Sequence, residues 1–226
     1  MSDEASRTGR GGGLAAREPA RPAKFTDPFR TADGQVRARV ALTRLETLWF
    51  NTGTLCNIEC DNCYIFSSPV NDRLAYITAP EASAYLDEIR DLGLDVREIG
   101  FTGGEPFMNP DILRMIGDAL ERGHEVLVLT NAMKPMMRPA MQGGLLKLKA
   151  AHGPRLTLRV SLDHYSAAFH EMERGAGSWQ LVLDGLDWLS RHGFSINVAG
   201  RTCWNETEAE ARKGFKALFA EKGWRI

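Results

Sequence analysis

The stretch TLWFNTGTLCNIECDNC, residues 47–63, joins an apolar strand pattern to a loop that carries three cysteines. Strand-like runs recur further along the chain, at residues 97–102, 125–130, 156–162 and 194–200, and amphipathic helical patterns separate them. Repeated strand–helix units predict parallel strands joined by right-handed crossovers. The pattern by itself fits either a doubly wound sheet or a β/α barrel.

Several helix boundaries are marked in the sequence. Thr78 and Glu81 have the spacing of a capping box, and they precede apolar residues at helical period. A weaker helical pattern covers residues 140–151. Three further N-caps are predicted, at Asn109, Ser178 and Asn205. Residues 224–226, which follow a predicted helix stop at Gly223, resemble the start of a sixth strand, so we expect the chain to be truncated at its C-terminus.

Composition limits the class of protein. Residues 1–35 are rich in Gly, Ala, Arg and Pro and predict a disordered leader, followed by one domain over residues 36–226. The 28 basic and 29 acidic residues leave a net charge of −1, which offers no general attraction for nucleic acid or an anionic membrane. No run approaches the roughly 20 apolar residues of a membrane span, and no signal-peptide core precedes the domain. These features predict a cytoplasmic protein.

The cysteines Cys56, Cys60 and Cys63 have the spacing C-x3-C-x2-C. Three thiolates on one loop can hold three irons of a four-iron cluster and leave the fourth iron open to an outside ligand. Structural zinc is disfavoured because it needs a fourth ligand, and no histidine lies near this loop. Three inert buried cysteines would not explain such a density of thiols. The isolated Cys203 is interpreted as a small buried apolar residue.

Polar motifs follow the other strands. The segment Thr102-Gly103-Gly104-Glu105-Pro106 ends the second strand. Its glycines allow close approach of the backbone to a ligand, and its carboxylate or carbonyl groups could accept from an ammonium group. Thr130-Asn131 ends the third strand, and Ser161-Leu162-Asp163 ends the fourth. Because parallel strands end at one edge, we expect these motifs to lie near the cysteines.

With these motifs the chain resembles the radical S-adenosylmethionine (radical SAM) family over about residues 47–226. The resemblance implies a partial (β/α)6 TIM-like barrel, incomplete at the C-terminus, that binds a [4Fe–4S] cluster through the three cysteines. It also implies SAM contacts, which we assign to Gly103, Gly104, Glu105, Thr130, Ser161, Asp163 and Arg201. Asp163 is interpreted either as a ribose or substrate contact or as a turn cap, and Arg201 as a partner of the SAM carboxylate.

The resemblance implies a reaction as well. A reduced cluster cleaves SAM to methionine and a 5′-deoxyadenosyl radical, which takes hydrogen from a peptide or small-metabolite substrate. An electron donor such as flavodoxin or ferredoxin is implied, and no further catalytic residue is assigned. Two alternatives remain open: a non-enzymatic iron–sulfur protein for electron transfer or sensing, and a catalytically incomplete fragment.

Details of the sequence bear on the branch within this family. His170, Arg174-Gly175 and Gly177-Ser178-Trp179 resemble a run found in the SPASM and peptide-modifying branches, whose auxiliary-cluster cysteines would lie beyond Ile226. The chain also resembles the molybdenum-cofactor cyclase branch. However, Gly100 and Ser195 stand where that branch carries basic residues, which disfavours GTP as substrate. Asn62 stands where the family usually has an aromatic residue beside the adenine.

Overall fold

The computed structural model describes residues 26–41, 43–202 and 204–226, and the chain divides into compact units at residues 1–43 and 44–226. In the first unit, an antiparallel bridge joins Arg30 and Val36, and the Arg37 amide donates to the Phe29 carbonyl at 2.8 Å. This turn lies partly in the segment predicted as a disordered leader, of which residues 1–25 lie outside the described part. The division between the units falls later in the chain than the boundary predicted after residue 35.

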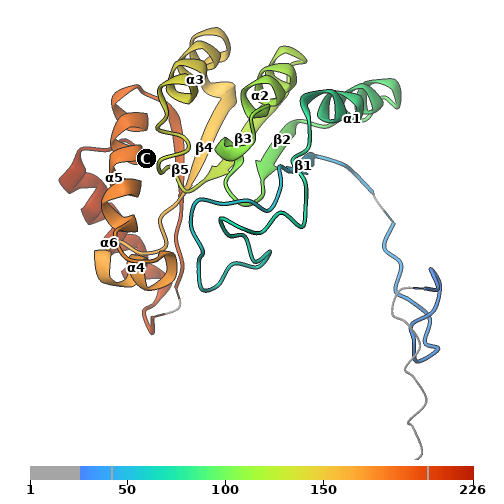
Figure 1. The fold of residues 1–226 in the computed structure, drawn as a ribbon, viewed down its shortest axis with the longest axis horizontal. Coiled ribbons are helices and arrows are strands. Elements are labelled where there is room, and N and C mark those ends of the chain that lie inside the picture. The colour runs from blue at the N-terminus through green and yellow to red at the C-terminus, as the bar shows by residue number, and fades with distance from the viewer. Residues whose placement is uncertain (1–25, 42, 203) are drawn as a thin grey trace, which may run out of the picture. The chain divides into compact units, whose positions relative to one another are not determined.

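The second unit is built on one parallel sheet whose strands follow one another in chain order (Figure 1). The five strands are β1 (Thr47–Asn51), β2 (Glu98–Thr102), β3 (Glu125–Thr130), β4 (Leu156–Ser161) and β5 (Ser195–Ala199). Each strand pairs in parallel with the next, from β1 with β2 to β4 with β5. A doubly wound sheet would reverse its strand order at a switch point, so the open sheet has the arrangement of a partial β/α barrel, as predicted.

Helices connect these strands. The structure has α1 (Ala79–Asp91), η1 (Pro106–Met108), α2 (Ile112–Glu121), α3 (Pro139–His152), η2 (Gly153–Arg155), α4 (Ala167–Arg174), α5 (Ser178–Arg191) and α6 (Glu208–Lys222). In Figure 1, α1, α2 and α3 lie on one side of the sheet, and the loop between β1 and α1 lies on the other. In the part that the structure describes, no helix is both long enough and apolar enough to cross a membrane.

The predicted start of α1 is confirmed. Thr78 Oγ1 accepts from the Glu81 amide at 3.4 Å, and the Glu81 carboxylate accepts from the Thr78 amide at 2.8 Å. The prediction of Asn109 as the cap of α2 is wrong, because Asp111 holds that position. The Asn109 side chain instead donates to the carbonyls of Thr52 and Ile77, at 3.2 and 2.8 Å. Asn109 therefore joins the loop after β1 to the start of α1.

Two other helix starts and the last strand differ from the prediction. α5 has Gly177 as its N-cap with Ser178 as its first residue, and α6 begins after Thr207 in a capping box rather than after Asn205. Residues 224–226 do not form a strand. The Trp224 indole is buried and donates to the Asp187 carboxylate at 2.6 Å, so this segment packs against α5.

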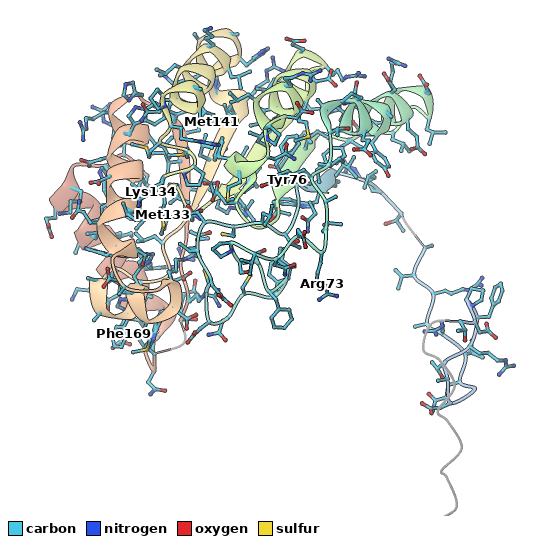
Figure 2. The ribbon with its side chains drawn as sticks, in the orientation of Figure 1. Arg73, Tyr76, Met133, Lys134, Met141 and Phe169 are labelled. Carbon is cyan, nitrogen blue, oxygen red and sulfur yellow. The ribbon has the colours of Figure 1, made fainter. Side chains whose placement is uncertain are left out.

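The core lies between the sheet and its helices. Its largest fully buried side chains include Phe101, Phe107, Ile112 and Ile116. Methionines after β3 extend this core, and Figure 2 shows Met141 at α3 and Met133 lower in the view, beside Lys134. A flexible thioether chain fills irregular gaps well. The packing holds the carboxyl ends of β2, β3 and β4 in fixed relative positions, and these ends carry the polar motifs.

Candidate functional site

The loop that carries the cysteines is bonded to its neighbours through its backbone. Leu55 forms a parallel bridge with Ser68, and the Cys56 amide donates to the Ser68 carbonyl at 3.1 Å. From β2, the amides of Gly104 and Glu105 donate to the carbonyls of Gly53 and Leu55, at 2.9 and 3.1 Å. The first part of the loop therefore runs along the end of β2.

This close contact explains the glycine pair after β2. A Cβ atom on Gly104 would lie 2.1 Å from the Leu55 carbonyl oxygen, a distance that no carbon tolerates. Gly103 has a φ of 139°, and a Cβ there would lie 2.7 Å from the Gly53 carbonyl oxygen. From the sequence alone, these glycines are explained by close approach of the backbone to a ligand. The close contact with the cysteine loop is by itself sufficient to require glycine at both positions.

Three thiols and the ends of three strands line one cavity of about 180 Å³. Of the predicted site residues, Cys56, Cys60, Cys63, Gly103, Gly104, Thr130, Ser161 and Arg201 line it, together with Asn62, Ser67, Asn131 and Arg174. The side chains of Glu105 and Asp163 do not. A larger hollow of about 660 Å³ lies along β5 and α6, but its lining contains no thiol. The chemistry of the lining, rather than its size, therefore identifies the smaller cavity as the candidate site.

Burial weakens the acidity of two of the thiols, Cys56 and Cys60, in the absence of a metal. It raises the pKa of Cys56 to about 12 and also raises the pKa of Cys60, where the nearby Arg174 charge acts in the opposite direction. Metal binding to these two residues must therefore release protons. Within the described ranges, no three His, Cys, Asp or Glu side chains converge tightly enough to hold one metal ion. A four-iron cluster takes one thiolate on each iron, so its ligands need not converge in this way.

Glu105 is buried behind the cavity wall. One carboxylate oxygen accepts from the Thr130 hydroxyl at 2.8 Å and from the Phe107 amide at 3.2 Å, and the other accepts from the Asn131 amide at 2.8 Å. Burial raises the pKa of Glu105 to about 7, although these three donors favour the charged form. The carboxylate is thus occupied in joining β2 to the end of β3, and it positions the cavity-lining pair Thr130-Asn131.

Asp163 is also buried, and two arginines surround it. Arg174 Nε and Nη2 donate to its two carboxylate oxygens at 2.7 and 3.1 Å, and Arg201 Nε donates to Oδ1 at 3.2 Å. The Arg201 amide also donates to the Asp163 carbonyl at 2.8 Å. One interpretation of the sequence expected this carboxylate to cap a turn. Instead it bonds to two arginines and fixes their positions in the cavity wall. Two guanidinium groups with one carboxylate leave a positive charge, which suits an anionic ligand group.

Sequence reasoning missed α4 and its contact with the cysteine loop. Asn62 Nδ2 lies 2.9 Å from each carboxylate oxygen of Glu173, and the Asp61 amide donates to the Glu173 carbonyl at 3.1 Å. The only indication in the sequence was that Asn62 stands where the family that the chain resembles usually has an aromatic residue. Ser67, which lines the cavity, had no signal at all, and Cys203 lies outside the described residues.

The residues present fit an iron–sulfur cluster with a bound cosubstrate. Three thiols reach the cavity, and the adjacent Ser67 hydroxyl is buried without a hydrogen-bond partner in the described part of the chain. A buried hydroxyl without a partner carries a cost that an acceptor in the cavity would remove. The positive pair formed by Arg174 and Arg201 provides a place for a carboxylate.

Comparison with known proteins gives related sequences. The profile of the radical SAM superfamily matches residues 50–215. The subtilosin biosynthesis protein AlbA of Bacillus subtilis is 29% identical over 145 residues, which are 64% of this chain and 30% of AlbA. A GTP 3′,8-cyclase of Microcystis aeruginosa is 26% identical over 187 residues, which are 76% of this chain and 51% of the cyclase. The chain thus spans about a third to a half of the length of these two relatives.

Solved structures share the fold. SuiB of Streptococcus suis, in its complex with S-adenosylmethionine, superimposes with a TM-score of 0.63 at 16% identity, covering 80% of this chain and 39% of SuiB. Methylornithine synthase superimposes with a TM-score of 0.55 at 15% identity, covering 77% of this chain and 51% of that enzyme. The open five-stranded sheet is therefore an arrangement that other proteins also adopt.

Proposed function

The chain belongs to the radical SAM superfamily, and we propose that Cys56, Cys60 and Cys63 bind a [4Fe–4S] cluster beside a SAM site. When bound, such a cluster supplies the electron that cleaves SAM to methionine and a 5′-deoxyadenosyl radical. The observation that carries the proposal is that the three thiols line the same cavity as the ends of β2, β3 and β4. Among the residues that the structure describes, no fourth thiol lines it, so three thiolates would leave one position for an outside ligand.

We assign the carboxylate of SAM to the cations of the cavity wall. Arg201 is the better candidate because its side chain is 37% exposed, whereas that of Arg174 is 10% exposed and held by two bonds to Asp163. The Ser161 hydroxyl at the end of β4 is available for a further polar contact, and the Thr130 hydroxyl, which donates to Glu105 and accepts from the Ala132 amide, keeps one lone pair for a donor in the cavity. Glu105 and Asp163 act in this proposal through the residues that they position.

The substrate is proposed as a peptide or a small metabolite. Both kinds occur in the names of the related proteins: SuiB has been solved with its precursor peptide SuiA, and the cyclase acts on GTP. A one-electron donor such as flavodoxin or ferredoxin would reduce the cluster. We place the protein in the cytoplasm, because three neighbouring thiols persist in a reducing compartment.

Anaerobic reconstitution with iron and sulfide tests the proposal. We expect absorbance at about 400 nm, typical of thiolate-ligated clusters, and formation of 5′-deoxyadenosine and methionine after dithionite and SAM are added. Changing any of Cys56, Cys60 or Cys63 to Ala should abolish both signals, whereas the matched Cys203→Ala variant should keep them. Stoichiometric zinc without inorganic sulfide would contradict the cluster. A cluster that never cleaves SAM would support an electron-transfer or sensor role instead.

A further inference from the structure

Phe66 has a backbone conformation that a bulky residue rarely adopts. Its φ is +54°, in the left-handed region, and its side chain is 75% exposed. The aromatic ring therefore gains little burial that could offset the cost of this backbone conformation. Such a conformation persists only where surrounding contacts hold it, and the contacts around Phe66 lead to the third cysteine.

Two hydrogen bonds fix this turn. The Phe66 amide donates to the Cys63 carbonyl at 3.1 Å, and Asn71 Nδ2 donates to the Phe66 carbonyl at 2.7 Å. As a result the next amide, that of Ser67, points back and donates to Cys63 Sγ at 3.3 Å. The left-handed residue thus turns a backbone donor onto a sulfur that we assign as a cluster ligand.

The Ser67 side chain adds a second donor at the same place. Ser67 is 3% exposed, and its hydroxyl has no partner among the residues that the structure describes. It lines the same cavity as the three thiols. A buried hydroxyl of this kind is costly when it lacks an acceptor, and a cluster sulfur or a thiolate in this cavity would provide one.

We propose that the Phe66–Ser67 turn is a positioning device that directs two hydrogen-bond donors, the amide and the hydroxyl of Ser67, at the sulfur atoms of the cluster site. Reduction adds negative charge to these sulfurs, so donors stabilise the reduced state more than the oxidised state and raise the reduction potential. The inference rests on the proposed cluster and adds to it the groups of this chain that set how easily the cluster accepts an electron.

A redox titration followed by electron paramagnetic resonance tests the inference on the anaerobically reconstituted chain. Ser67→Ala removes the hydroxyl and should shift the midpoint potential to a more negative value. Phe66→Val should also shift it negatively, because a β-branched residue disfavours positive φ and moves the Ser67 amide away from Cys63. Phe66→Gly should keep the wild-type potential, since glycine adopts this φ without strain.

Ser68→Ala is the matched control. It removes the neighbouring hydroxyl, which accepts from the Val70 amide at 3.4 Å and lies outside the cavity lining, and should leave the potential unchanged. If Phe66→Val does not fold, as judged by circular dichroism, Asn71→Ala replaces it, because it removes the bond to the Phe66 carbonyl and otherwise only the one that Asn71 Oδ1 accepts from the Arg73 amide. Equal potentials in wild type, Ser67→Ala and the turn variant would overturn the inference while leaving the cluster intact. A wild-type chain that assembles no cluster would overturn the proposed function and this inference together.

Discussion

Both carboxylate oxygens of Glu173 lie 2.9 Å from the Asn62 amide nitrogen, so α4 is joined to the cysteine loop at the residue before Cys63. Glu173 is buried, although its side chain is polar, and the Asp61 amide donates to its backbone carbonyl. The loop that carries the thiols is thus held at β2 near its start and at α4 near its third cysteine.

Loss of this contact should loosen the loop. We expect Glu173→Ala to lower the iron and sulfide retained after reconstitution and to speed loss of iron to a chelator, because the Asn62 amide loses its acceptor. Met172→Ala, which changes an exposed side chain of the same helix, should behave as wild type. Equal rates of iron loss in both variants would show that the bond between the Glu173 and Asn62 side chains does not hold the loop.

The two arginines around Asp163 should differ in their roles. Arg174→Gln removes the more buried partner of Asp163 and should destabilise the fold by about 3–5 kcal/mol. Arg201→Gln should change the denaturation midpoint little, since its side chain is 37% exposed, yet weaken SAM binding by roughly tenfold. Urea unfolding and anaerobic calorimetry with SAM measure the two quantities. An Arg201→Gln variant with wild-type SAM affinity would remove this residue from the site.

Gly104 should tolerate no side chain. Gly104→Ala places a carbon against the Leu55 carbonyl and should cost about 1–3 kcal/mol or more. Gly143→Ala is the matched control, because Gly143 lies inside α3 with nothing within 4 Å of the added carbon. That variant should gain about 0.5–1 kcal/mol from helix propensity. Urea unfolding compares the pair, and equal free energies of unfolding would show that the loop moves away from β2 without cost.

His170 should make the fold sensitive to acid. Burial lowers its pKa from 6.5 to about 4, and both ring nitrogens are without partners in the described residues. The unfolded chain takes up a proton as the pH falls below about 6.5, whereas the folded chain resists until about pH 4. Stability from this group is therefore present above pH 6.5 and is lost as the pH falls toward 4, by up to about 3 kcal/mol.

The His170→Phe variant tests this dependence, because phenylalanine keeps an aromatic ring beside Trp179 and does not titrate. Its free energy of unfolding, measured by urea at pH 7 and pH 5, should fall less on acidification than that of the wild type. Parallel losses in the two proteins would mean that His170 is already charged in the folded state.

Much of the fold could be predicted from sequence because its strands are apolar runs set between capped helices. The capping box at Thr78 was found because both partners are local. The cap of α2 was misplaced, since Asn109 bonds to Thr52 and Ile77, which are distant in sequence. The short α4 was missed because its inward residues, His170 and Glu173, are polar and give no apolar period.

The candidate site divides in the same way. The three cysteines and the glycine pair could be found from spacing, and the structure brings them to one cavity. The roles of Glu105 and Asp163 could not be predicted, because a carboxylate in a sequence does not reveal whether it faces a ligand or another side chain. Neither side chain lines the cavity, and each bonds to a residue that does.

The backbone bonds along the start of the cysteine loop have a consequence for metal capture. The bonds of Gly53, Leu55 and Cys56 to β2 and to Ser68 join only backbone groups of the chain itself. We therefore expect this segment to lose its conformational entropy when the chain folds rather than when iron binds. Iron should then bind to a largely preformed site rather than induce folding of the loop. We expect the apoprotein and the cluster-bound protein to resist proteolysis of this segment equally.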